Sequence, residues 1–314
     1  MDYPFFEGHE EVPFSWQPGL CNLGAAWWLS ELALLAYEHP RFIEMTLRWL
    51  GATHYRFFDI HTMQCFVCVL HQRCIVSFRG TELTSMKSFA DIRSDLNIAM
   101  TDFHGYGLVH QGFSEAFAEV FSGETPMWEY VHQVMASAEV SDVYFTGHSL
   151  GGAIATLAAV YFGNEAGPLI TFGAPRVGSE QFVTHLPADT WRFVNEGDIV
   201  SVVPPNLREE EPERRWGHGG ELICVLKNGE IQRNPEDAQH HALDVVTEQI
   251  RNTAASVWDA IIGLGKVQDS PAGDDTAAGT VTQTLRDATL DAHAPGRYST
   301  NIWNAIARTG VWEI

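Results

Sequence analysis

The stretch VYFTGHSLGGAIATLAAV, residues 143–160, decides the fold expected for this chain. It opens with β-branched and aromatic residues, passes through a turn crowded with glycine, and ends in an alanine-rich run. That order predicts a short strand, a sharp turn and a helix. One serine, Ser149, stands in the turn between Gly147 and Gly151. Side chains at those two positions would collide with the neighbouring strand and helix, which explains both glycines.

In this setting Ser149 is a candidate nucleophile. A serine on a strained strand-to-helix turn presents its hydroxyl at the edge of a sheet. The helix that follows adds the positive end of its dipole and free N–H groups beneath that hydroxyl. A bare G-x-S-x-G is a weak signal in a chain with 27 glycines, and the alternative is a glycine turn of an α/β crossover with an incidental serine. Strand, turn and helix together favour the nucleophile.

Strands and helices alternate along most of the chain. Hydrophobic periodicity predicts helices over 22–38, 41–50, from about Ser114 into the 130s, 237–264 and 297–309, and strands over 55–60, 65–70, 74–78, 143–146, 169–173, 190–195 and 222–226. This alternation is typical of an α/β fold with a central, mostly parallel sheet flanked by helices. We expect residues 1–314 to form one domain, with a flexible surface loop at about 265–285, where the sequence is small and polar.

Charge and hydropathy limit the partners. Forty acidic and 19 basic side chains give a formal net charge of -21, which repels nucleic acid and anionic membrane surfaces. We therefore expect no nucleic-acid partner. No apolar run is long enough for an integral membrane segment, and the N-terminus lacks the pattern of a secretory signal. The expected location is the cytoplasm, with export by a signal-independent route as the alternative.

The five cysteines do not form a disulfide framework by count, because their number is odd. Cys65 and Cys68 form a C-x-x-C within a β-rich run. Residues three apart in a strand point to opposite faces, so these two thiols could not share a metal. We expect buried free thiols and no metal site.

Several linked motifs carry a family resemblance. GHSLGG follows IVSFRGT (75–81) and VHQGF (109–113), and precedes FGAPRVG (172–178) and VNEGDIVSVVPP (194–205). In this order they resemble the class 3 lipases, α/β-hydrolases related to the fungal triacylglycerol lipases. The resemblance implies an α/β-hydrolase fold for this chain.

A serine nucleophile needs a histidine base and an acid that orients it, in the chain order Ser, Asp or Glu, His. Asp198 follows the strand predicted over 190–195 and matches the acid of the family. The alternative reading of Asp198 is a turn-forming residue beside Gly197. Asp189 also follows Ser149, but it precedes the strand and is the poorer candidate.

Four histidines follow Asp198 in the chain. The resemblance favours His293, in the loop before the terminal helix, as the base. His218 remains the open alternative, while His240 and His241 stand at the start of a predicted helix, where a surface or core role is more common. His148 is not a candidate base, because neighbouring residues on such a turn point apart.

The developing oxyanion needs two N–H donors. The backbone N–H of Leu150, directly after the nucleophile, is one candidate. The resemblance implies Thr81 as the other, in a turn that would end a strand in any case. Residues 82–96 carry apolar side chains at helical spacing, and the resemblance implies a lid over the site there. An ordinary packed amphipathic helix fits the same pattern.

The resemblance implies a serine hydrolase that acts on lipid esters, triacylglycerol or smaller acylglycerols, through an acyl-enzyme and without a cofactor. Transient contact with a lipid interface belongs to the same expectation. Phospholipase A1 activity and feruloyl-type esterase activity are alternatives on related scaffolds. An acyltransferase with the same triad is another alternative, and so is a non-catalytic lipid- or partner-binding protein that lost its base.

Overall fold

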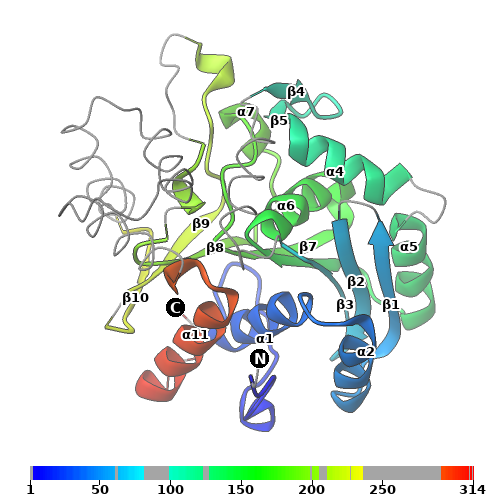
Figure 1. The fold of residues 1–314 in the computed structure, drawn as a ribbon, viewed down its shortest axis with the longest axis vertical. Helices are drawn as coiled ribbons and strands as arrows, with labels where there is room; N and C mark the ends of the chain where they lie inside the picture. The colour runs from blue at the N-terminus through cyan, green and yellow to red at the C-terminus, as the bar shows by residue number, and fades with distance from the viewer. Residues whose placement is uncertain are drawn as a thin grey trace, which may run out of the picture.

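The centre of the molecule is an eight-stranded sheet with the strand order β1-β2-β3-β6-β7-β8-β9-β10 (Figure 1). The computed structural model describes residues 3–60, 63–80, 99–122, 127–198, 200–204, 211–226, 228–235, 291–310, 312 and 314. The strands of the sheet are β1 (Thr53–Ile60), β2 (Met63–Leu70), β3 (Arg73–Phe78), β6 (Val143–His148), β7 (Ala166–Phe172), β8 (Thr190–Asn195), β9 (Glu221–Val225) and β10 (Ile231–Arg233).

The middle of the sheet is parallel and its edges are antiparallel. β3, β6, β7, β8 and β9 run parallel to one another, whereas β1 with β2, β2 with β3, and β9 with β10 pair antiparallel. Along the chain, helices separate β3 from β6 and β6 from β7, in the kind of crossover that parallel pairing requires. The prediction of a mostly parallel central sheet flanked by helices is confirmed.

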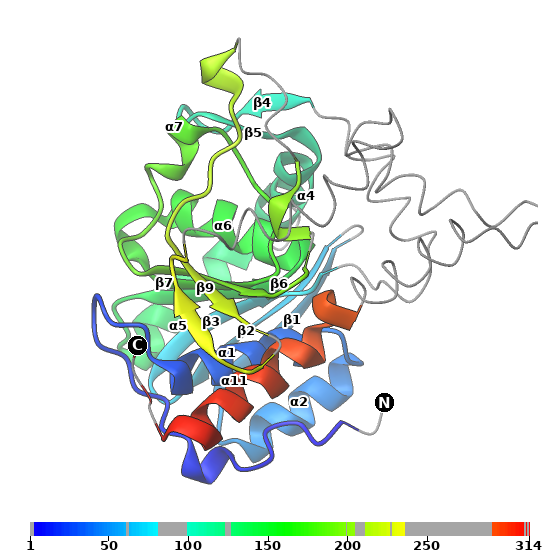
Figure 2. The ribbon, with the colours of Figure 1, turned by 90° about the vertical axis from the view of Figure 1, so that its left-hand side faces the viewer.

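Helices cover both faces of the sheet (Figures 1 and 2). One face carries α1 (Leu23–Leu35), α2 (Pro40–Trp49) and α11 (Pro295–Thr309), and the other carries α4 (Gln111–Ser122), α5 (Met127–Ala138) and α6 (Leu150–Phe162). Shorter elements are η1 (His9–Glu11), η2 (Gly163–Glu165), α7 (Glu180–Val183), η3 (Val200–Val202) and η4 (Pro212–Arg214). All residues of α1 are buried: this apolar helix lies against the sheet beside α11 (Figures 1 and 2).

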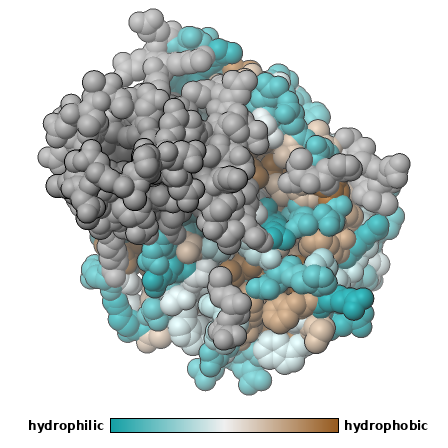
Figure 3. Space-filling model, viewed as in Figure 1, coloured by the Kyte–Doolittle hydropathy of each residue, from teal (hydrophilic) through white to brown (hydrophobic). Residues whose placement is uncertain are grey.

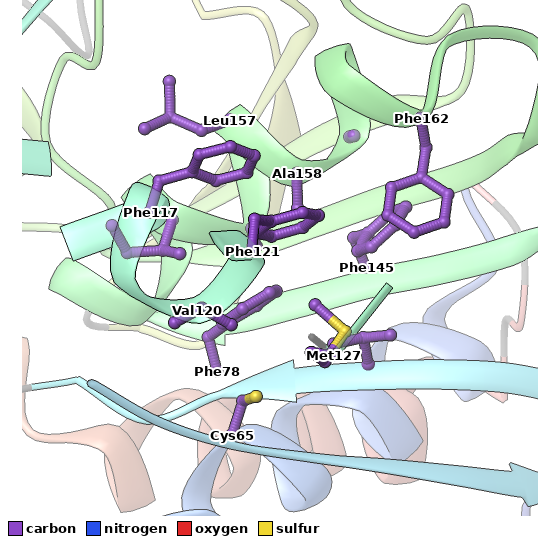
Figure 4. Packing of buried hydrophobic residues seen from close by; sticks show 14 of the residues in the cluster. Cys65, Phe78, Phe117, Val120, Phe121, Met127, Phe145, Leu157, Ala158 and Phe162 are labelled. Carbon is purple, nitrogen blue, oxygen red and sulfur yellow. The ribbon is translucent and has the colours of Figure 1, made fainter. Parts of the chain in front are cut away.

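The core beneath α4 and α6 is built from interlocking aromatic rings (Figure 4). Phe117 and Phe121 stack with their centroids 3.9 Å apart, and Phe121 meets the edge of Phe162 at 6.1 Å. Phe162 in turn packs on Phe145 of β6 at 5.1 Å. Full burial of such a side chain stabilises the fold by about 1.5–3 kcal/mol. These rings fix α6, and with it the residues at its N-terminus, against the sheet.

The cysteines behave as the sequence predicts. Cys65 of β2 lies in the core on the α4–α6 side, whereas Cys68 of the same strand lies in the core on the α1 side. All five cysteines are buried and free. Burial raises the pKa of the Cys65 and Cys68 thiols, so both stay protonated. Among the described residues, no group of three or more His, Cys, Asp or Glu side chains could hold a metal ion.

Some details of the fold differ from the sequence prediction, which also lacks the short elements α7 and β10. The single helix expected from Ser114 into the 130s is wrong, because α4 ends at Ser122 and α5 begins at Met127. The four intervening residues include a glycine and Pro126, which has no N–H for a helical hydrogen bond. A small antiparallel pair, β4 (Met100–Asp102) and β5 (Leu108–His110), was not expected from the sequence.

Some predictions lie outside the described residues: the lid segment 82–96, the helix over 237–264 and the loop at about 265–285. The single-domain organisation stays a prediction. On the face in Figure 3, hydrophilic and hydrophobic residues share the described surface. None of the helices described is long and apolar enough to cross a membrane.

Candidate active site

Ser149 lies at the junction of β6 and α6 with a strained backbone. Its φ is 55° and its ψ is -126°, a conformation that costs a residue with a side chain about 1–3 kcal/mol. Hydrogen bonds keep the backbone in this conformation: the Ser149 N–H donates to the Phe172 carbonyl at 3.0 Å, and the Ser149 carbonyl accepts the N–H of Ala153 at 3.2 Å. The chain thus makes the sharp strand-to-helix turn that the sequence predicts.

Gly147 and Gly151 are glycine for the predicted steric reason. A Cβ on Gly147 would lie 2.4 Å from the carbonyl carbon of Gly151. A Cβ on Gly151 would lie 2.2 Å from the carbonyl oxygen of Phe78 in β3. Both separations are far below van der Waals contact, so any side chain here would push α6 away from the sheet.

Asp198 and His293 form a buried pair. His293 Nδ1 lies 2.8 Å from Asp198 Oδ2, and both side chains are fully buried. The same Oδ2 accepts the hydroxyl of Tyr298 at 2.5 Å, and Oδ1 accepts the N–H of Val200 at 2.9 Å. Burial, together with the nearby Asp198 charge, raises the pKa of Tyr298 well above its usual value, so its hydroxyl stays a donor.

The pairing determines the tautomer of His293. A carboxylate that accepts hydrogen bonds requires the proton of the imidazole on Nδ1. Nε2 then carries the free lone pair. In the described structure, His293 Nε2 is buried and has no hydrogen-bond partner. An unoccupied basic nitrogen of this kind is what a general base needs.

The end of β8 holds the loop that contains His293. Asn195 donates from its side chain to the Ala292 carbonyl at 2.9 Å, and from its backbone N–H to Tyr298 at 3.2 Å. Asn301 of α11 donates to the side-chain oxygen of Asn195 at 3.0 Å. These bonds join segments about 100 residues apart in the chain, and Asn195 was not singled out by the sequence.

Gly173 lies between the Ser149 turn and this pair, and it is a second residue that sequence reasoning missed. It has a φ of 57°, and a Cβ there would lie 2.6 Å from Asp198 Oδ2 and 3.0 Å from His293 Nδ1. Its neighbour Phe172 accepts the N–H of Ser149. Ser149, Asp198 and His293 therefore border the same two residues at the end of β7. The available signal was the glycine in FGAPRVG.

The other candidates have different surroundings. His218 has a pKa pushed well below its usual value by burial and by the charges of Arg192 and Arg176. The imidazole bonded to Asp198 is that of His293. Asp189 accepts from Trp16 and from the backbone of residue 19, and so anchors the N-terminal loop.

Three further histidines complete the comparison. His110 is buried against Phe113, and burial lowers its pKa to about 4. His240 and His241 lie outside the described residues. The assignment of His293 as the base stays a prediction. Its hydrogen bond to Asp198 and its unbonded Nε2 are compatible with that role.

Leu150 is the first residue of α6, and N–H groups in the first turn of a helix lack intrahelical acceptors. Its N–H is thus available to an oxyanion. Thr81 lies outside the described residues. A Cβ on the preceding Gly80 would lie 2.5 Å from the His148 carbonyl oxygen, so the chain that leads to Thr81 passes against the turn. Both oxyanion roles stay predictions.

Comparisons with known proteins bear on this geometry. Residues 75–208 match the family model described as Lipase (class 3). The lipase ZK262.3 of Caenorhabditis elegans is 31% identical over 190 residues, which cover 55% of this chain and 48% of the relative. The secreted mono- and diacylglycerol lipase 1 of Fusarium solani is 36% identical over 126 residues, or 36% of this chain and 35% of the relative. The chain spans less than half the length of these two relatives.

Solved structures show the same architecture. The Rhizomucor miehei lipase in its propeptide complex matches with a TM-score of 0.52 and 21% identity. The match covers 71% of this chain and 76% of that chain. At 21% identity, the similarity to this solved structure shows a shared fold and nothing further.

Proposed function

We propose that this chain, whose residues 75–208 match the class 3 lipase family, hydrolyses carboxylic esters of lipids through an acyl-enzyme on Ser149. Its α/β-hydrolase fold brings the serine turn and the buried Asp198–His293 pair to the end of β7. The observation that carries the proposal is the free Nε2 of His293, opposite a nitrogen held by a carboxylate 2.8 Å away.

The proposed reaction follows from these atoms. Ser149 Oγ attacks the ester carbonyl while His293 Nε2 takes its proton, and the imidazolium then protonates the departing alcohol. Asp198 holds the ring and stabilises its positive charge. The N–H of Leu150, together with Thr81, would hold the oxyanion of each tetrahedral intermediate. Water, activated by the same imidazole, releases the carboxylic acid. These steps require no cofactor.

A fluorophosphonate probe and an ester panel test this function. We expect the probe to label the purified chain, Ser149→Ala to abolish labelling, and kcat to fall by about four orders of magnitude or more. His293→Ala should be impaired to a similar degree. Labelling that persists in Ser149→Ala would contradict the nucleophile. Activity that is lost in His218→Ala but kept in His293→Ala would contradict the base.

Acylglycerols are the proposed substrates, in line with the family and with the Fusarium solani relative, which is a mono- and diacylglycerol lipase. Phospholipids and feruloyl esters in the same panel distinguish the phospholipase A1 and feruloyl-esterase alternatives. Product analysis with a competing alcohol identifies an acyltransferase. A chain that the probe does not label would instead be a non-catalytic binding protein.

We also propose that contact with lipid is transient and involves the outer face of α2. Phe42, Met45 and Trp49 are 42%, 70% and 61% exposed, and their spacing places them along one side of the helix. Exposed apolar side chains that gather on one helix are typical of an interaction surface. The net charge of -21 favours an uncharged over an anionic lipid surface.

A further inference from the structure

Two polar side chains beside the site, the buried His148 and the half-buried Tyr37, have no part in the proposed reaction. His148 is the last residue of β6 and directly precedes Ser149. Its Nε2 lies 2.7 Å from the main-chain oxygen of His293, and its Nδ1 lies 2.8 Å from the hydroxyl of Tyr37. The rings of His148 and His293 have their centroids 4.5 Å apart. His148 thus joins the strand of the nucleophile to the loop of the base.

The direction of both hydrogen bonds follows from the chemistry of the partners. A main-chain carbonyl only accepts, so the proton of His148 is on Nε2. Nδ1 then has a lone pair, and the Tyr37 hydroxyl donates to it. Burial, the largest cause, and the neighbouring His293 hold the pKa of His148 well below its usual value, which keeps the ring neutral and this arrangement intact.

Tyr37 also touches the chain that leads to the predicted oxyanion donor. A Cβ on Gly80 would lie 2.2 Å from the Tyr37 hydroxyl oxygen, and the Arg79 guanidinium lies 5.7 Å from the centre of the tyrosine ring. Thr81 follows directly in the sequence. Tyr37 therefore contacts both the segment before Thr81 and the residue before Ser149.

We propose that Tyr37 and His148 are positioning residues, which hold the main chain of His293 in register with Ser149. This rests on the proposed function. Asp198 fixes the imidazole of His293 at Nδ1, and the bond from His148 fixes the backbone of the same residue at its carbonyl. Two anchors on one residue limit the distance that its free Nε2 can drift from the nucleophile. Tyr37 acts through His148, whose ring it holds in orientation by the hydrogen bond to Nδ1.

Loss of the second anchor should affect the chemical step more than substrate binding, because His148 is buried and both of its ring nitrogens bond within the protein. His148→Leu removes the donor with similar bulk, and leaves the His293 carbonyl unsatisfied. We expect kcat to fall about ten- to hundredfold, with KM within about twofold of wild type. The rate constant of fluorophosphonate labelling should fall by the same factor as kcat.

Two conservative variants separate positioning from packing. The side-chain amide of His148→Gln can place an N–H near the position of Nε2, and we expect it to recover most of the loss. Tyr37→Phe should lower kcat about three- to tenfold. Because Tyr37 acts through His148, the two losses should not be additive, and the double variant with Tyr37→Phe should lose less than the product of the two single losses. Tyr55→Phe, whose hydroxyl bonds the Pro40 carbonyl away from the site, is the matched control.

The outcomes are distinct. A wild-type chain that is inert to the probe and to all esters overturns the proposed function and this inference with it. A reactive wild type with a folded His148→Leu variant of equal kcat overturns this inference alone. His148→Gln as impaired as His148→Leu contradicts the role of the donor. If His148→Leu fails to fold, the Tyr37→Phe variant provides the test. A Tyr37→Phe variant with wild-type kcat and unchanged Tm overturns the proposal. A lowered kcat at unchanged Tm supports it.

Discussion

At the scale of single residues, the geometry of the site depends on glycines, which have no Cβ atom where the chain packs closely. Gly147 and Gly151 let α6 lie close to β6 and β3, and both could be predicted because a serine on a strand-to-helix turn requires glycine two positions before and after it. Gly173 has the same kind of role but could not be predicted from local sequence. The groups that its Cβ would meet come from Asp198 and His293, which are 25 and 120 residues further along the chain.

Gly173→Ala tests this close approach. The methyl group would lie 2.6 Å from Asp198 Oδ2 and displace the acid from His293, so we expect kcat to fall at least about tenfold. The positive φ adds a loss of about 1 kcal/mol in the free energy of unfolding. Ester hydrolysis and thermal unfolding measure the two effects.

Gly163→Ala is the matched control for that variant. Gly163 has a φ of 58°, close to the 57° of Gly173, but a Cβ there meets nothing within 4 Å. It should lose a similar amount of stability from backbone strain and keep full activity. Equal kcat values for the two variants would show that Gly173 matters only for its backbone.

At the scale of secondary-structure elements, local signals were sufficient for most helices and strands. Asn22 caps α1, since its side chain accepts the N–H of Ala25 at 2.8 Å. The division of one expected helix into α4 and α5 shows how apolar periodicity can continue across a break. The short strands β4 and β5 were missed because three residues carry too little pattern.

The outer face of α2 provides a prediction at this scale. Met45→Glu should weaken binding to uncharged phosphatidylcholine vesicles about tenfold or more. The substitution removes an apolar side chain whose transfer from water into an apolar environment is favourable by about 1.5–3 kcal/mol. Hydrolysis of a monomeric short-chain ester should stay unchanged. Co-sedimentation with vesicles measures the binding.

Leu20→Glu is the control, because Leu20 is also exposed and apolar but lies outside α2. It should bind vesicles like the wild type. A Met45→Glu variant with wild-type binding would show that α2 is not the contact surface.

At the scale of the whole molecule, a buried carboxylate joins three distant segments. Glu31 of α1 accepts the Tyr3 hydroxyl at 2.5 Å, the Phe6 N–H at 2.8 Å and the Ser299 hydroxyl of α11. Burial raises the pKa of Glu31 above its usual value despite these donors. α11 also carries Tyr298, which bonds Asp198, so the contact supports the helix that borders the site.

The raised pKa of Glu31 makes the stability of the fold depend on pH in a definite direction. The folded chain binds a proton on residue 31 more tightly than the unfolded chain, whose glutamate has a pKa of about 4.3. This contribution to the free energy of unfolding is full below that value, and is lost as the pH rises through the folded pKa. Glu31→Gln should therefore show a smaller decline of Tm with rising pH than the wild type.

Thermal unfolding across the acid to neutral range measures that difference. Glu44→Gln is the matched control, since Glu44 lies on the surface of α2 in a pair with Arg48. Its profile should follow the wild type. Parallel profiles for wild type and Glu31→Gln would contradict a raised pKa at residue 31.

Taken alone, the sequence predicted most of the strands and helices, the turn around Ser149 and a resemblance to the class 3 lipases, because each of these is recorded in short runs of neighbouring residues. It proposed Asp198 and His293 by resemblance. Only the tertiary structure decided which imidazole pairs with Asp198, why residue 173 is glycine, and how Tyr37 and His148 reach the base. These contacts join residues up to about 150 positions apart in the chain. They form only when the whole sheet packs, so no local sequence pattern can predict them.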